Sequence, residues 1–226
     1  MAFTTLDLSK QSGSSLPSTI TSLDATKLSG NLPSISGSNL TGITTGAMVL
    51  VETKTISSGA STVDFTSGIS STYRMYMWHV INVDVSADAN LQLLYSIDGG
   101  SNYKTDSNFY DYAVRMYNSN NSFGTNPSAS DTKMDLTVGG SQMDDSDSHN
   151  TTMTIYMSAH ADNNTRTNFH WHLGLCGTSS GFATGGYGAG GLRDTSAVVN
   201  GIRFKLSSGN FDSGHISMYG IATWVI

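Results

Sequence analysis

The sequence predicts an all-β fold: an antiparallel β-sandwich or jelly roll preceded by an extended arm. Apolar and polar residues alternate with a period of two in several stretches, as in strands with one buried face. Turn residues separate these stretches about every 8 to 20 residues, and no helical pattern intervenes. Charged residues are only 12% of the chain, about half the usual share, which argues against long solvated helices.

Residues 1–46 differ from the rest and are expected to form an N-terminal arm, separate from a head at residues 47–226. The arm is rich in Ser and Thr, which is typical of a flexible linker. Apolar residues nevertheless recur every few positions, which a linker does not need; they are Leu28, Leu32, Ile35, Leu40 and Ile43.

Burial of these five side chains would yield about 7–15 kcal/mol. Ordering the roughly 16 residues that carry them costs about 16–32 kcal/mol in backbone entropy. The arm should therefore not fold alone. It is expected to become ordered only when sister copies or a docking partner add buried surface, and the alternative is a plain linker.

The strands of the head follow in series from Ala47. Residues 72–84 should form a central strand, with Tyr76, Trp78 and Val80 on one face and Tyr73, Met75, Met77, His79, Ile81 and Val83 on the other. Leu91, Leu93, Tyr95 and Ile97 alternate next and end in the turn sequence Asp98-Gly99-Gly100. The other predicted strands are 48–54, 109–117, 132–138, 151–159, 167–175 and 197–206.

The last stretch, 201–226, is expected to close the sandwich as a hairpin. Ile202, Phe204 and Leu206 alternate with charged residues, and alternation resumes at Ile216, Met218 and Gly220. The intervening Ser207–Gly214 segment is turn chemistry, because Gly209 and Gly214 can take positive φ.

The charge balance restricts the partners. The net charge is −6, the isoelectric point is near 5.3 and basic residues do not cluster, so nucleic acid is not expected as a partner. The one cysteine, Cys176, excludes an internal disulfide framework. Neither a signal peptide nor an apolar run of about 20 residues is visible, so we expect cytoplasmic synthesis without membrane insertion.

Two sets of motifs resemble structural proteins of tailed bacteriophages. Ser96–Tyr103, Phe109–Tyr112, Gly201–Phe204, Ser208–Asn210 and Met218–Ile221 resemble a jelly-roll module common in such proteins. In the arm, Lys27–Pro33 and Gly37–Ile43 are similar to the L-x-G-x-L-P … G-x-N-L-x-x-[ILV] segments of phage fibres. The resemblance implies a homotrimeric virion protein, on the tail or as a head fibre, that attaches to other virion proteins through its arm and points its head outward.

Two glycine-rich motifs match enzyme patterns without the required context. Gly177–Gly181 fits a nucleophile elbow, and Gly186–Gly191 fits a dinucleotide-binding fingerprint. Both need a following helix, which the sequence does not predict. The preferred interpretation is one long exposed loop over 174–191 that presents Phe182 and Tyr187 for recognition. A second polar loop offers Asn120, Asn121 and Phe123, with an ordinary surface turn as its alternative.

Metal sites have weaker support. His170 and His172 share one face of a strand, and on a threefold axis three such pairs would supply six nitrogens. The resemblance adds that some phage fibres and spikes hold iron through H-x-H; the alternative is a solvent-facing pair. Asp144, Asp145 and Asp147, followed by His149, could hold Ca²⁺, although a solvated hairpin tip explains them better.

Catalysis is not expected. Glycosidic chemistry needs a pair of acids on a concave surface, and the chain has a single glutamate, Glu52. The sequence favours a non-enzymatic fibre protein without cofactor, whose three heads bind host-surface glycans multivalently. The alternative is a purely structural decoration, head-fibre or tail component without a receptor.

Overall fold

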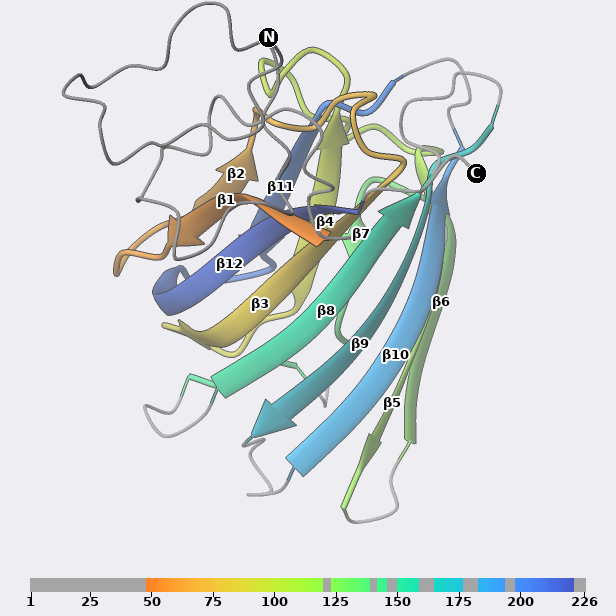
Figure 1. Ribbon diagram of the computed structural model, residues 1–226. Helices are drawn as coiled ribbons and strands as arrows, with labels where there is room; N and C mark the ends of the chain where they lie inside the picture. The colour runs from red at the N-terminus through yellow and green to blue at the C-terminus, as the bar shows by residue number, and fades with distance from the viewer. Residues whose placement is uncertain are drawn as a thin grey trace, which may run out of the picture. The chain divides into compact units, whose positions relative to one another are not determined.

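A computed structural model describes residues 48–119, 123–138, 142–145, 150–158, 165–176, 183–193 and 198–221. These residues belong to one compact unit, Thr45–Ile226. The described ranges are all β, with two antiparallel sheets and no helix, as predicted for an antiparallel β-sandwich (Figure 1). The described residues therefore include no helix that could cross a membrane. The arm residues Leu28, Leu32, Ile35, Leu40 and Ile43 lie outside the described ranges.

The larger sheet has eight strands in the order β1-β12-β3-β8-β9-β10-β5-β6. Figure 1 shows β12, β3, β8, β9 and β10 side by side across it. In sheet order the bounds are Met48–Thr55, Phe211–Ile221, Met75–Val85, Asn150–Ser158, Asn168–Cys176, Ala183–Leu192, Tyr110–Asn118 and Phe123–Asp131.

The smaller sheet has four strands in the order β2-β11-β4-β7. Its strands span Thr62–Phe65, Gly201–Leu206, Leu91–Ser96 and Met134–Asp135. The last of these is much shorter than the strand predicted over 132–138. Leu91, Leu93 and Tyr95 are buried as expected, whereas Ile97 is exposed beyond the end of β4.

The predicted closing hairpin is wrong, although both of its strands exist. β11 pairs with β2 and β4, whereas β12 pairs with β1 and β3 in the other sheet. Gly209 takes a positive φ of 65° between the two strands, as expected, whereas Gly214, with a φ of 112°, lies inside β12 at a register shift and not in a turn. The segment between the strands thus crosses from one sheet to the other instead of reversing the chain within a sheet.

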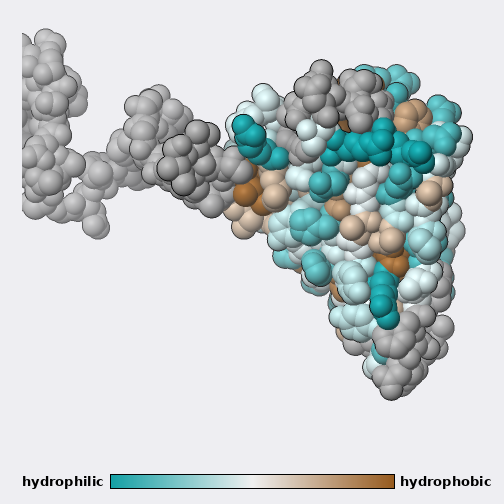
Figure 2. Space-filling model, turned by 90° about the vertical axis from the view of Figure 1, so that its right-hand side faces the viewer, coloured by the Kyte–Doolittle hydropathy of each residue, from teal (hydrophilic) through white to brown (hydrophobic). Residues whose placement is uncertain are grey.

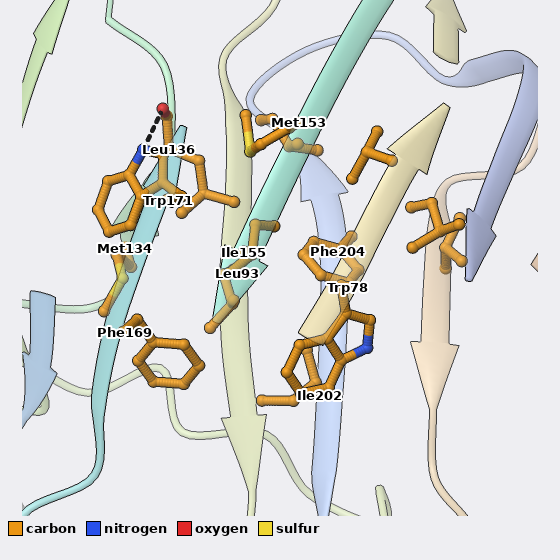
Figure 3. Close-up of a cluster of buried hydrophobic side chains, with 14 of the residues drawn as sticks. Trp78, Leu93, Met134, Leu136, Met153, Ile155, Phe169, Trp171, Ile202 and Phe204 are labelled. Atoms are coloured by element: carbon orange, nitrogen blue, oxygen red, sulfur yellow. Dashed lines mark hydrogen bonds between the residues drawn. The ribbon is translucent and has the colours of Figure 1, made fainter. Parts of the chain in front are cut away.

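The core lies between the two sheets. Figure 3 shows Trp78, Ile155 and Trp171 of the large sheet with Leu93, Ile202 and Phe204 of the small one. Phe65 packs edge-on against Trp78 and Phe204, with ring centroids 6.2 Å apart in both pairs. Aromatic pairs of this geometry add about 0.5–1.5 kcal/mol each beyond their area burial. The Phe65–Trp78 pair joins the two sheets, whereas the Phe65–Phe204 pair lies within the smaller sheet.

β3 is internal to the large sheet, as predicted, but one of its residues faces the other way. Tyr76, Trp78 and Val80 are fully buried, and Val83 is buried as well. The register shifts between Val80 and Val83, where Asn82 has a φ of 49°. Such an irregularity reverses the alternation, so Val83 joins the core instead of the opposite face.

A polar network holds the short strand β7 in place. The Gln92 amide donates to Asp135 Oδ1 at 2.8 Å, and the Tyr112 hydroxyl lies 3.0 Å from Asp135 Oδ2 and 3.1 Å from Asp131 Oδ2. Burial and the two nearby carboxylates raise the pKa of Tyr112 above its usual range. The hydroxyl therefore remains a donor that ties β5 to the segment around β7.

Candidate functional site

The outer face of the large sheet presents a set of polar and aromatic side chains to solvent. β9 alternates strictly, with Phe169, Trp171, Leu173 and Leu175 buried. Its other side exposes Asn168, His170, His172, Gly174 and the free thiol of Cys176. Because β8 and β10 flank β9, the outward side chains are held by a rigid backbone.

The prediction of a loop over 174–191 is wrong where the neighbouring strand β10 lies. Ala183–Leu192 is a regular strand between β9 and β5. Its inward glycines make room for large side chains: a Cβ on Gly188 would lie 2.2 Å from Trp171 Cζ2, and one on Gly190 would lie 2.6 Å from Met134 Cε. The glycines thus serve close packing within a sheet, which also removes the structural basis for a dinucleotide fingerprint at 186–191.

Trp171 occupies the space that Gly188 leaves. Its indole is fully buried, and Nε1 donates to the carbonyl oxygen of Leu136 at 3.0 Å (Figure 3). With Trp171 inside, the alternation of β9 sends His170 and His172 outward. The same alternation on β10 sends Tyr187 outward between Gly186 and Gly188.

The register places one outward row across the whole sheet. Within it, Tyr187 lies directly between His172 of β9 and Arg115 of β5. Directly opposed residues on adjacent strands bring their side chains into reach of one another. The complete row is Thr53, Ser217, His79, Thr154, His172, Tyr187, Arg115 and Thr125.

Tyr117 provides a flat aromatic surface next to this row. It pairs with Gly185, and a Cβ on Gly185 would lie 2.6 Å from Cζ and 2.8 Å from Cε2 of the tyrosine. The ring therefore lies against the glycine backbone, an arrangement known as aromatic rescue of a strand glycine. Tyr117 is still 49% exposed and Tyr187 47% exposed, so both rings present surface to solvent.

A second outward row supports the histidines. The rings of His170 and Tyr156 stack with centroids 4.6 Å apart and an interplanar angle of 11°. Beyond His170 the row continues with the small residues Ala189 and Ala113. These small side chains lie beside Tyr187 of the first row, which is 47% exposed. We call Tyr117, Tyr187, Arg115, His170 and His172 the aromatic face.

Figure 2 looks onto the side of the molecule where β5, β6 and β10 lie. Residues of intermediate and hydrophilic character dominate this side, and hydrophobic residues are scattered. A surface of this kind is suited to a polar ligand, because extended apolar patches are what mark strongly hydrophobic docking sites.

The structure confirms some of the predictions made for ligand-binding residues and corrects others. Tyr187 is exposed as expected, but on a strand and not in a loop. Phe123 begins β6 opposite Tyr117, so its backbone belongs to a strand as well. Asn120, Asn121 and Phe182 lie outside the described ranges. The strand ends that flank them are neighbours, since Thr184 pairs with both Asn118 and Leu175.

Among the described residues, none supplies a third ligand to the predicted histidine pair. His170 and His172 are both exposed on one face of β9, as expected, but no described histidine, cysteine or carboxylate completes a group of three with them. Asp144 and Asp145 lie with Asp88 so that their carboxylate oxygens fall within 4.8 Å of one another. Exposed acidic groups gather in this way without an ion, and Asp147 and His149 lie outside the described ranges.

The smaller sheet carries the other notable polar pair. Arg203 donates from Nε and Nη2 to the two carboxylate oxygens of Asp64 at 2.8 and 2.6 Å. Its guanidinium carbon lies 3.9 Å from the ring centroid of Tyr103. Burial and the Asp64 carboxylate raise the pKa of Tyr103 to about 12. Because Arg203 and Asp64 satisfy each other and the guanidinium packs on the Tyr103 ring, the cluster is structural.

Sequence reasoning missed Tyr117 and Arg115. Both alternate with buried Tyr112, Val114 and Met116 on β5, so the signal for outward position was present. What the sequence did not reveal was the register that brings them beside Tyr187.

No family model, curated protein or solved structure matches this chain.

Proposed function

We propose that the protein is a non-enzymatic virion fibre protein of a tailed bacteriophage. In this proposal it forms a homotrimer, attaches to other virion proteins through residues 1–46 and presents a jelly-roll head to host-surface glycans. The support is the resemblance of the arm and head motifs together with the two-sheet β architecture of the described residues. No cofactor or turnover is needed.

The observation that carries the adhesive role is the arrangement of Tyr117 and Tyr187. One ring lies on the Gly185 backbone, and the other stands two residues along the same strand from that glycine. Tyrosine rings offer a rigid apolar surface with a polar tip, which suits the apolar faces and hydroxyls of sugars. Ordering such a ring costs little side-chain entropy, because tyrosine has only two χ angles.

Multivalency would complete the mechanism. A shallow face with two exposed rings binds a single sugar weakly. When three identical heads are linked, the second and third contacts become intramolecular, and avidity can exceed the single-site affinity by about 10²–10⁴-fold. A repeated surface polysaccharide supplies the matching repeated ligand.

The test measures binding of the full chain to immobilised bacterial surface polysaccharides. Light scattering first tests whether the full chain is a trimer. Tyr117→Ala and Tyr187→Ala are each expected to weaken binding about tenfold or more, whereas Val198→Ala removes exposed apolar surface next to β11 and should leave binding unchanged. Thermal unfolding verifies that each variant is folded.

Two results would contradict the adhesive role. One is a folded trimer that binds none of the polysaccharides and no host cells. The other is binding that survives both tyrosine substitutions, because the ligand would then use another surface.

A structural role without a receptor is the second candidate, and the edge strand β1 favours it. Met48 is 53% exposed and Leu50 55% exposed on the outer side of this strand. Leu50 is directly opposite the half-buried Tyr219 of β12. Exposed apolar residues at a sheet edge suit contact with another protein. Absence of glycan binding by the folded trimer would favour this candidate.

A further inference from the structure

The fixed charge on the aromatic face is opposite in sign to the net charge of the whole chain. The protein carries a net charge of −6. Nevertheless His79, His170, His172 and His215, which are all the histidines that the structure describes, lie on the outer side of the large sheet. Arg115 lies on the same side, and it carries a fixed positive charge.

Carboxylates are scarce among the outward positions of the strands that form this face. In the described parts of β8, β9, β10, β5 and β6 the outward series contains one acidic residue, Asp111. Asp111 lies at the far end of β5 and forms an ion pair with Arg193 at 3.3 Å. Among the described outward residues next to Tyr187, the one with a fixed charge is therefore Arg115.

We propose that the aromatic face selects acidic polysaccharides, whose repeating units carry a carboxylate, sulfate or phosphate group. Anionic groups of the polymer would lie against Arg115 on one side of Tyr187 and against His172 on the other, while sugar rings rest on Tyr187 and Tyr117. This inference rests on the proposed adhesive function and specifies its ligand.

The spacing of the strands suits such a ligand. His172 and Arg115 occupy the strands on either side of Tyr187. Strands in a sheet are about 4.8 Å apart, so these two positions are separated by about 10 Å. A short stretch of polysaccharide can cover the ring and reach the imidazole on one side and the guanidinium on the other.

Nothing charged opposite His172 competes for a ligand's anion. Its cross-strand neighbours are Thr154 of β8 and Tyr187 of β10, and its neighbours on the same face of β9 are His170 and Gly174. Across Tyr187 the next residue of the row is Arg115.

Nucleic acid also combines anionic groups with stackable rings, but the face suits it less. Affinity for nucleic acid grows with the number of phosphates that fixed cations neutralise. Arg115 is the single lysine or arginine among the described outward residues of β8, β9, β10, β5 and β6. One fixed cation in a protein of net charge −6 suits an isolated anionic substituent on a sugar better than a phosphate backbone.

The experiment compares three sets of probes on the full chain at low salt: acidic bacterial polysaccharides, the same polymers after carboxyl reduction or removal of the acidic substituent, and single-stranded oligonucleotides. We expect binding to the acidic set, with a loss of about tenfold or more on neutralisation, as for a charge-assisted hydrogen bond. Arg115→Gln should cause a similar loss, and Arg115→Lys a smaller one. The matched control Arg74→Gln, at an exposed position before β3, should leave binding unchanged.

The outcomes separate this inference from the proposed function. Binding to neutral polymers that Tyr187→Ala abolishes and Arg115→Gln leaves intact would overturn the acidic ligand while keeping the adhesin. Preferential binding of oligonucleotides would overturn it as well. Absence of binding to every polysaccharide by a folded trimer would overturn both proposals.

Discussion

Replacement of Gly188 by alanine tests how the candidate face is supported from inside the protein. The new Cβ would lie 2.2 Å from Trp171 Cζ2, 2.3 Å from Cε2 and 2.9 Å from the Ala113 carbonyl oxygen. Ordinary contact begins at 3.4 Å, so the indole must withdraw by about 1.2 Å (3.4 − 2.2 Å). The indole cannot do so freely, because it is fully buried and hydrogen-bonded to Leu136.

The magnitude follows from these contacts. Overpacking of a filled core costs about 1–3 kcal/mol, and loss of the indole hydrogen bond adds about 1 kcal/mol. Replacement of glycine within a strand returns about 0.5–1 kcal/mol. The net destabilisation of Gly188→Ala is therefore about 1–3 kcal/mol, which corresponds to a fall in Tm of about 2–12 °C for a domain of this size.

Gly174 provides the matched control on the neighbouring strand. It faces outward, and no heavy atom lies within 4 Å of the position its Cβ would take. Gly174→Ala should therefore leave the free energy of unfolding unchanged or raise it by up to about 1 kcal/mol. Urea and thermal unfolding of both variants measure the difference. Equal midpoints for Gly188→Ala and Gly174→Ala would refute the packing of Trp171 against β10.

Two further predictions concern charged groups. Arg203→Lys should lower the free energy of unfolding by about 1 kcal/mol, because lysine cannot form the two-pronged pair with Asp64 and the site is partly exposed; urea titration measures it, and an unchanged midpoint would contradict it. At Asp131, burial alone would raise the pKa, but hydrogen bonds from Thr132 and Ser128 and the Lys133 ammonium outweigh it and lower the pKa to about 2. Its folded pKa lies below 3.8, the usual pKa of an aspartate, so this stabilisation is present above about pH 4 and is lost as the pH falls towards 2. Unfolding of Asp131→Asn should consequently vary less with pH over that range, and an acid limb as steep as that of the original chain would contradict the assignment.

Alternation and turn chemistry were sufficient to predict the fold class. The predicted faces of β3, β9 and β12 agree with the observed burial up to Val80 in β3. Beyond that point a register shift at Asn82 reversed the pattern. A single irregular residue is invisible in a periodicity count, so the error at Val83 has a local cause.

The missed strand β10 has a different cause. Glycine ordinarily signals turns, and β10 reads Ala-Thr-Gly-Gly-Tyr-Gly-Ala-Gly-Gly-Leu. These glycines make room for two side chains of other strands, Trp171 of β9 and Met134 of β7. Likewise the turn after β11 gave no sign that β12 belongs to the other sheet. Pairing partners remote in sequence decide both features, and local patterns do not encode them.

The candidate site was predictable in its chemistry and not in its place. Tyr187 and the two histidines were identified as exposed, yet Tyr187 was assigned to a loop. Tyr117 joins them only because β5 lies beside β10 in a register that sets the ring on Gly185. A tyrosine in an alternating strand looks ordinary until the glycine that receives its ring is known.

The free thiol at the end of β9 gives a practical means of following ligand binding and trimer formation. Cys176 is exposed, is the one cysteine in the chain and lies two residues beyond Gly174 on the same side of the strand. A maleimide dye would therefore attach to a single known position on the sheet without any engineered substitution. Its fluorescence would report the arrival of a polymer near Tyr117, and in a trimer energy transfer between dyes would report how far apart the three sheets stand.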